Sequence, residues 1–254
     1  MFLPLPNEKD ISRHTIVEHF TNRLQRDVNL GSVLQLGKDH ANLFRDYVSK
    51  RIVISCLKPK QDETVLDFGC GVGRLSRHLA KRCKRVEAVD ATPAMIETAC
   101  ANFENPSNIT YRVLESTVLP FASDSLDAAF TFWVLQHCGD DTLKRVLREI
   151  HRVLKPGGRF VLMEQTANKR MVYEGWNIHR TVEEYKRFGQ DAALEVLSEK
   201  HVMRNPSRGM AIWIKLKRDW KPLLPLLYRL DRAVLHRKIE NVEYFTTAVE
   251  FVKR

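Results

Sequence analysis

The segment from residue 60 to residue 165 alternates short apolar runs with stretches of helical periodicity. Strand-like runs fall at residues 64–69, 85–90, 109–115, 126–133 and 159–165, and helical patterns fall at residues 74–84, 93–102 and 141–154. This alternation is typical of βαβ units, whose parallel strands form one sheet with helices on both faces. The sequence therefore predicts a doubly wound α/β fold, with ligands bound at the carboxyl ends of the strands.

Further elements extend this core at both ends. The sequence predicts helices at residues 11–24 and 41–57, a capping box at 181–184 that opens another helix, and strands at 194–202 and 244–253. We therefore expect a Rossmann-like, mostly parallel, seven-stranded sheet with N-terminal helices. A helical insertion should precede the last strand.

A glycine-rich turn follows the first strand of the core and opens its first helix. It reads Asp67-Phe68-Gly69-Cys70-Gly71-Val72-Gly73, and its glycines allow the backbone to approach a ligand while the helix N-terminus stays free. The G-x-G-x-G spacing differs from the G-x-G-x-x-G of dinucleotide-binding proteins. Asp67 would repel a pyrophosphate and suits a ligand with a positively charged amino group. Asp90, which ends the next strand, is placed to reach a ribose diol.

These residues and the motifs that follow resemble the class I S-adenosylmethionine-dependent methyltransferases, especially those that act on small molecules and lipids. The resemblance covers about residues 65–165, with the motifs VLDFGCGVGRLS, VEAVDATPAMI, LPFASDSLDAAF, WVLQH and REIHRVLKPGGRFVL in the family's order and spacing. It implies a methyltransferase enzyme that uses S-adenosyl-L-methionine as its cofactor.

The resemblance also implies the cofactor contacts, position by position. Asp67 and the turn residues Gly69, Cys70, Gly71 and Gly73 are expected at the methionine part, and Asp90 is expected at the ribose hydroxyls. The remaining expected contacts are Ala91 and Met95 beside the adenine, Glu115 and Ser116 at its edge, and Phe132 and Trp133 between cofactor and acceptor. Glu115 stands where the family more often has an aspartate.

The chemistry of methyl transfer needs a positioned acceptor, and an oxygen acceptor also needs a base. His137, just past the fourth strand, is the first candidate for this base, because histidine titrates near neutrality. Glu164, near the end of the fifth strand, is the second candidate. Each has an alternative: His137 could cap or pack its loop, and Glu164 could bond to neighbouring backbone. Tyr173, Trp176 and His179 are expected either to contact the acceptor or to form a small hydrophobic cover.

By this interpretation residues 1–254 form a single methyltransferase domain. It comprises an N-terminal helical cap at 1–59, a cofactor-binding core at 60–165, and a C-terminal substrate half at 166–254 with a basic insertion at 204–241. The five cysteines contain no C-x-x-C pair, so we expect reduced thiols and no metal site. With neither a signal-like N-terminus nor an apolar stretch that would span a bilayer, the expected location is the cytoplasm, either free or peripheral at the inner membrane surface.

The net charge of +10 arises mainly in one segment. Residues 204–238 contain ten lysines and arginines against two aspartates. Within this segment an apolar stripe faces a polar side that carries Arg229, Arg232 and His236; the stripe consists of Leu223, Leu227, Leu230 and Val234, broadened by Leu226. This pattern predicts either a lid that packs on the protein's own core or a helix that lies on an anionic membrane.

The function most consistent with these residues is methyl transfer to a small-molecule, glycan or lipid-linked acceptor, with oxygen as the methylated atom. The alternative is a tRNA or rRNA methyltransferase, because a basic patch suits nucleic acid. An RNA substrate is less favoured, since the chain has neither an Asn-Pro-Pro-Tyr-like tetrapeptide nor a recognisable RNA-binding module. The glycine spacing and Asp67 disfavour a dinucleotide oxidoreductase, and a non-catalytic cofactor binder stays open.

Overall fold

The computed structural model describes residues 13–26, 39–101, 104–173, 177–205, 207–216, 220–235 and 244–254. Their order along the chain is α1 (Arg13–Arg26), α3 (Asp39–Leu57), β1 (Thr64–Phe68), α4 (Arg74–Leu79), β2 (Arg85–Asp90), α5 (Pro93–Ala101), β3 (Ile109–Val113), β4 (Leu126–Phe132), α6 (Asp140–Val153), β5 (Leu154–Thr166), β6 (Met171–Tyr173), β7 (Asn177–His179), α7 (Val182–Asp191), β8 (Leu194–Asn205), α8 (Arg208–Leu216), α9 (Leu224–Val234) and β9 (Tyr244–Lys253). Short 3-10 helices lie at Ala80–Arg82, Leu135–His137 and Lys221–Leu223.

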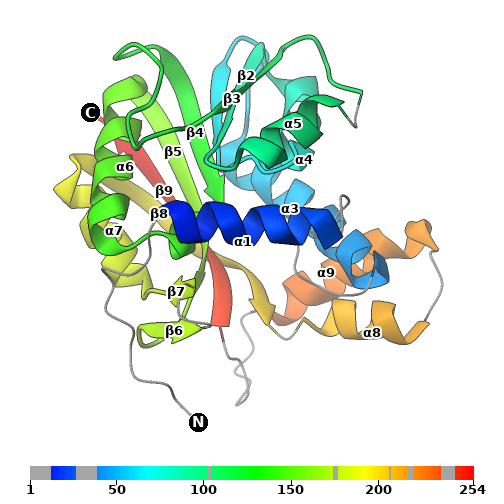
Figure 1. Cartoon of the computed structure of the whole chain (residues 1–254). Coiled ribbons are helices and arrows are strands. Elements are labelled where there is room, and N and C mark those ends of the chain that lie inside the picture. The colour runs from blue at the N-terminus through cyan, green and yellow to red at the C-terminus, as the bar shows by residue number, and fades with distance from the viewer. Residues whose placement is uncertain are drawn as a thin grey trace.

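The main sheet has seven strands in the order β3-β2-β1-β4-β5-β9-β8. Strands β1 to β5 run parallel, and β9 pairs antiparallel with both β5 and β8. Helices α3, α4, α5, α8 and α9 pack on one face of the sheet, while α6 and α7 pack on the other (Figure 1). This arrangement confirms the predicted Rossmann-like fold, including the insertion of α8 and α9 before the last strand.

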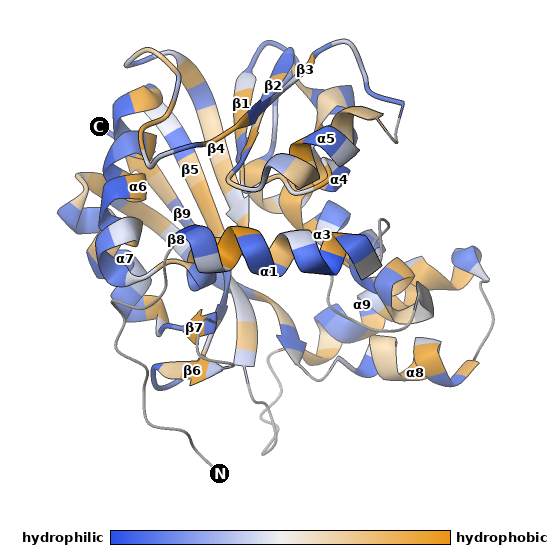
Figure 2. Cartoon of the chain, viewed as in Figure 1, coloured by the Kyte–Doolittle hydropathy of each residue, from blue (hydrophilic) through white to orange (hydrophobic). Residues whose placement is uncertain are grey.

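The central strands are apolar because both of their faces are covered. In β1, Val65 belongs to the hydrophobic cluster under α3 and α4, whereas its neighbour Leu66 belongs to the cluster under α6 and α7. Ala128 and Ala129 in β4 divide in the same way. Alternate side chains of a strand point to opposite faces, so a parallel strand buried on both sides needs a continuous apolar run. Figure 2 shows this hydrophobic character along β4 and β5.

Two elements begin or end well away from the sequence prediction, and one hairpin was not predicted. The helix expected at 74–84 ends at Leu79 and continues as a 3-10 turn. Strand β5 begins at Leu154 and contains the glycines that were expected to precede it; Gly157 adopts a φ of 77°, and the pairing with β4 shifts register at this point. The hairpin of β6 and β7 was not predicted.

The capping box is present at the start of α7. The backbone N–H of Glu184 donates to Thr181 Oγ1 at 3.1 Å, and the N–H of Thr181 donates to Glu184 Oε2 at 2.8 Å. These two bonds satisfy groups that a helix start leaves unpaired. The motif therefore fixes where the chain turns into α7 after leaving the end of β7.

The basic insertion is more internal than its composition suggested. Leu224, Leu227 and Val234 are buried, whereas Leu226 and Leu230 are 61% and 37% exposed. Arg204, counted with the basic surface in the sequence analysis, is buried and donates to the carbonyl of Val234 at 3.2 Å. His236 lies outside the described residues. No helix within the described ranges is both long and apolar enough to cross a membrane.

Arg159 joins three elements at the amino-terminal edge of the sheet. Its guanidinium donates to both oxygens of Glu63 at 2.7 Å and to the carbonyls of Leu57 and Lys58 at 2.7 and 3.1 Å. Burial opposes ionisation of Glu63, but the hydrogen bonds and charges of Arg159 and Lys60 together outweigh it and hold the pKa of Glu63 below its ordinary value.

We predict that Arg159→Ala lowers the free energy of unfolding by about 3 kcal/mol, because it leaves Glu63 buried without its partner. Lys155→Ala is the matched control: Lys155 pairs with Asp127 but its side chain is 45% exposed, so its loss should cost less than about 1 kcal/mol. Urea denaturation at neutral pH measures both. Equal losses would contradict the role assigned to Arg159, and the difference should shrink as acid protonates Glu63.

Candidate functional site

A cavity of about 1350 Å³ lies at the carboxyl ends of the parallel strands. Helix α1 crosses in front of these strand ends (Figure 1), and its residues Arg13, Ile16 and Phe20 line the cavity. One end is formed by the glycine-rich turn and the residues after β2, and the other by β5, the β6–β7 hairpin, α8 and β9. Single ligand pockets commonly measure about 300–1000 Å³, so this cavity can hold a cofactor and an acceptor together.

The glycine-rich turn bends through three left-handed residues. The φ angles of Gly69, Gly71 and Gly73 are 81°, 53° and 73°, a region that side chains disfavour. A Cβ atom at Gly69 would collide with the side chain of Val134, and one at Gly73 would collide with Tyr111. Gly69, Cys70 and Gly71 line the cavity. Gly73 is absent from the lining, so its predicted cofactor contact becomes a packing role against β3.

Two buried carboxylates stand at this end of the cavity. Asp90 accepts hydrogen bonds from the backbone N–H groups of Gly71 at 2.8 Å and Thr92 at 2.9 Å, and Asp67 accepts one from the Ser76 hydroxyl at 2.6 Å. Burial raises the pKa of Asp67 to about 7, with a smaller contribution from the neighbouring Asp90 charge, while Ser76 and Arg74 act in the opposite direction. Burial also raises the pKa of Asp90. Such a pair favours a ligand that brings a positive charge and hydroxyl donors.

The residues expected around the adenine divide into two groups. Ala91, Met95 and Ser116 line the cavity. Glu115 is exposed and does not line it. Above this region Arg13 of α1 donates to the carbonyls of Ala91 at 3.0 Å and Leu114 at 3.1 Å. Sequence reasoning missed this contact, which ties the N-terminal helix over the cofactor end.

Phe132, the last residue of β4, and Trp133, which follows it, line the cavity between its two ends. Trp133 adopts a φ of 58°, which is uncommon for a bulky residue and marks a strained position. Its N–H donates to Met163 at 2.9 Å, its indole N–H donates to Thr246 at 3.1 Å, and the guanidinium of Arg45 lies over its ring at 5.0 Å. These contacts fix the indole between the cofactor and acceptor ends.

The two candidate bases occupy different environments. His137 lines the cavity and packs edge-on against Phe20, with 5.4 Å between ring centroids. Glu164 is fully buried and does not line the cavity. Its carboxylate accepts hydrogen bonds from three consecutive backbone N–H groups, those of Val134, Leu135 and Gln136, at 3.0, 3.0 and 3.3 Å. Glu164 therefore corresponds to the alternative foreseen for it, a carboxylate bonded to neighbouring backbone, and we assign it a positioning role.

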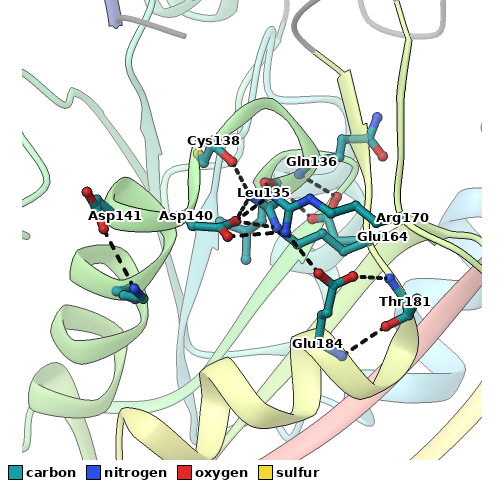
Figure 3. A network of polar contacts seen from close by, with 11 residues as sticks. Leu135, Gln136, Cys138, Asp140, Asp141, Glu164, Arg170, Thr181 and Glu184 are labelled. Atoms are coloured by element: carbon teal, nitrogen blue, oxygen red, sulfur yellow. Dashed lines mark hydrogen bonds and ion pairs between the residues drawn. The ribbon is translucent and has the colours of Figure 1, made fainter. Parts of the chain in front are cut away.

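A buried arginine, Arg180, binds the carbonyl groups of the same segment, residues 135–138. Arg180 donates to the carbonyls of Leu135 at 3.1 Å and Cys138 at 2.6 Å, and to Asp140 at 2.6 Å. Figure 3 shows the surrounding network, in which Arg170 joins Asp140 to Glu184. The segment that carries His137 is thus held between an acidic and a basic side chain. No sequence motif pointed to Arg180.

The acceptor end is aromatic and polar. Tyr173, His179 and Tyr244 line it. The ring centroids of Tyr173 and Tyr244 lie 4.6 and 4.7 Å from that of His179. His179 Nε2 lies 3.0 Å from Gln165 Oε1, and burial lowers the pKa of His179 to about 4, so this imidazole is neutral at physiological pH. Trp176, also expected here, lies outside the described residues.

The chain is similar to known methyltransferases. Residues 66–162 match the family described as "Methyltransferase domain". The chain is 30% identical over 173 residues to the ubiquinone/menaquinone biosynthesis C-methyltransferase UbiE of Acidiphilium cryptum, covering 65% of this chain and 66% of that one. It is 31% identical over 121 residues to the malonyl-[acyl-carrier protein] O-methyltransferase of Salmonella typhimurium, covering 48% and 45%.

A solved structure extends the likeness over most of the chain. The geranyl diphosphate C-methyltransferase of Streptomyces coelicolor has a TM-score of 0.66 and 14% identity, with 95% of this chain and 97% of that one covered; at this identity the likeness concerns the fold. The chain spans 34% to 66% of the length of the first curated relatives it matches. Domain match and fold together identify residues 66–162 as a methyltransferase domain of class I. The cofactor of that class is S-adenosylmethionine, whose ammonium and ribose groups suit the two carboxylates beside the glycine-rich turn.

We predict that affinity for S-adenosylhomocysteine, the demethylated cofactor, rises as pH increases through about 7. The pKa of Asp67 in the free protein is about 7, and the ligand's ammonium group favours the ionised carboxylate, so binding releases a proton. Below that pKa the affinity should fall by up to about tenfold per pH unit, and the dependence should disappear in Asp67→Asn. Titration calorimetry from about pH 5 to about pH 8, a range that brackets the pKa of Asp67, measures this dependence. An unchanged slope in the variant would reject the assignment.

Asp90→Ala should weaken binding of the same ligand by about 1–3 kcal/mol, because a charge-assisted hydrogen bond to the ribose is lost. Glu115→Ala removes an exposed carboxylate just outside the cavity and should leave the affinity unchanged. Calorimetry on both variants, with thermal unfolding as a check on folding, separates the two positions. Equal affinity of Asp90→Ala and the unmodified protein would contradict the ribose contact.

Proposed function

We propose that the protein transfers the methyl group of S-adenosylmethionine to a hydroxyl oxygen of a small-molecule acceptor. The observation that carries this proposal is the shared cavity: His137 lines the same space as the cofactor-binding turn and the aromatic acceptor end. The methyl donor is the cofactor indicated by the methyltransferase domain at residues 66–162. When bound, S-adenosylmethionine supplies a methyl group that is already electrophilic.

The chain's own contribution is mainly to hold and enclose the reactants. Asp67 and Asp90 support binding of the cofactor's ammonium and ribose groups, and Trp133 forms a fixed wall between the two ends of the cavity. Arg13 ties α1 over the cofactor end, which limits access of water. Positioning of this kind can supply a large part of the acceleration of a bimolecular transfer.

His137 is the best-placed group to receive the proton of an acceptor hydroxyl. Glu164 lies behind the backbone of residues 134–136 and outside the cavity lining. His179 is held neutral with a pKa of about 4, so it is a weak base near neutral pH. His137 lines the cavity and is carried by the 3-10 turn that Glu164 and Arg180 fix. A general base so placed contributes about 10²–10⁴-fold to the rate.

The lining of the acceptor end supports a ring-containing or unsaturated acceptor with polar substituents. Tyr173, Tyr244 and Met210 supply aromatic and polarisable surface, and Gln165 and Asn177 supply amide groups. Amide and hydroxyl groups among aromatic side chains fix the orientation of a small ligand. The relatives named above include both carbon and oxygen methyltransferases; oxygen is proposed here because a hydroxyl requires the base that His137 provides.

The test combines methyl-labelled S-adenosylmethionine with a small-molecule extract and identifies labelled products by mass spectrometry. We expect a product labelled on oxygen, and we predict that His137→Asn slows its formation by about 10²–10⁴-fold. S-Adenosylhomocysteine should bind His137→Asn as it binds the unmodified protein, which separates loss of the base from loss of the cofactor site.

Two results would contradict the proposal. A product labelled on carbon would overturn the choice of acceptor atom. If His137→Asn keeps the full rate, His137 does not act as the base and packs its loop instead. Preferential labelling of added tRNA would favour the RNA methyltransferase alternative.

A further inference from the structure

Exposed apolar side chains are concentrated on α8, on α9 and at Trp220, which precedes α9. Seven large apolar side chains are exposed among the described residues, and two of them, Val118 and Leu197, lie elsewhere. The other five are Ile212, Leu216, Trp220, Leu226 and Leu230, with exposed fractions of 39, 45, 63, 61 and 37%. Large apolar groups gathered on one part of a surface mark an interaction site more often than scattered ones do.

This exposure does not come from loose packing, because the inner faces of the same helices are buried. Trp213 is fully buried under α8, and Leu224 and Leu227 are buried under α9. The two helices meet closely at Gly209, where an added Cβ would collide with the Leu227 carbonyl, and the N–H of Gly209 donates to Asp231 at 2.6 Å. The exposed pairs 212/216 and 226/230 each lie one helical turn apart, so each helix presents an outer apolar stripe.

Basic side chains border these stripes. Those of Arg208, Lys215, Lys221, Arg229 and Arg232 are exposed, and none of the five pairs with a carboxylate in the part of the chain that the structure describes. Asp231, the acid on α9, is already bonded to Gly209 and to the Ser207 hydroxyl. The surface is therefore both apolar and cationic, and its charge is free to meet an anionic partner.

We propose that the outer surface of α8 and α9 binds an anionic lipid membrane. Apolar side chains that insert at the acyl boundary, bordered by lysines and arginines, are the features of an interfacial helix. RNA would instead need stacking aromatic side chains beside the basic groups, and Trp220 is the one exposed aromatic side chain among the large apolar residues of this surface. Aliphatic side chains, which make up the rest, favour lipid.

The same helix also reaches the cavity. Met210 of α8 lines the acceptor end together with Tyr244 and Arg45, less than one turn from the exposed Ile212. A membrane bound at the outer stripe therefore lies next to the acceptor end. This step rests on the proposed function: the acceptor is a lipid-soluble or lipid-linked hydroxyl compound that enters the cavity from the membrane surface.

The test measures sedimentation of the purified full chain with vesicles of phosphatidylcholine, alone or mixed with phosphatidylglycerol. We expect binding to the mixed vesicles that weakens at high salt. The double variant Trp220→Ser/Leu226→Ser should lose about tenfold or more in partitioning, and Lys221→Glu should lose about fivefold. The matched controls are Leu197→Ser, an exposed leucine on β8, and Arg148→Glu, an exposed arginine on α6; both should bind as the unmodified protein does.

Calorimetry with S-adenosylhomocysteine keeps the two proposals apart. A folded protein that binds this ligand but not the mixed vesicles would overturn the membrane proposal and leave the proposed methyl transfer intact. Vesicle binding that the α8–α9 variants do not reduce would place the contact elsewhere and also overturn it. Filter binding to tRNA tests the alternative occupant. If the protein binds tRNA at high salt and the same α8–α9 variants abolish this binding, the surface binds RNA and the membrane proposal is wrong.

Discussion

The segment after β4 depends on two buried side chains of opposite charge. Glu164 accepts from the backbone N–H groups of Val134, Leu135 and Gln136, and Arg180 donates to the carbonyls of Leu135 and Cys138. A chain that leaves a parallel strand toward a cavity has unpaired backbone groups, which cost free energy when buried. Here they are satisfied from both sides, which stabilises the turn that carries His137. Trp133, with its positive φ, stores strain that these bonds offset.

Burial of acidic groups has two different consequences in this protein. Glu164 and Asp67 are both buried, and burial raises the pKa of each to about 7. Glu164 is surrounded by backbone donors and turns away from the cavity, so its charge organises structure. Asp67 faces the cavity with a single hydroxyl partner, so its charge is best compensated by a ligand. The difference lies in what each carboxylate faces, and not in its depth.

The fold was predictable because it depends on local pattern. Alternation of apolar and helical periods predicted the parallel strands along the chain, and Asp90 and Gly69 lie within a few residues of strand ends. The capping box at Thr181 is likewise a local signal, and the structure contains it. Features of this kind involve residues that are close in the sequence, so a sequence pattern can reveal them.

The remainder depends on contacts between distant segments. Glu164 is a candidate base in the sequence because it lies near the end of a strand. Its hydrogen-bond partners become visible only in the structure, where the backbone of residues 134–136 packs against it. Arg204 was counted as surface charge, whereas β8 and α9 bury it. Arg13 and Arg45 reach the cavity from helices whose sequence shows only helical periodicity. No pattern in consecutive residues encodes these approaches.

The sequence offers a lid and a membrane contact as alternatives for the apolar stripe at residues 223–234, and the neighbouring helix α8 has features that suit both. Trp213 anchors the helix in the core, and Met210 lines the cavity, so α8 acts as a cover for the acceptor end. Ile212 and Leu216 nevertheless remain exposed on its outer side. Because a helix repeats every 3.6 residues, a nine-residue helix can present one stripe inward and another outward. Under the membrane proposal, a cover with two apolar stripes would give an apolar acceptor a path between membrane and cavity that a cover with a polar outer face would not.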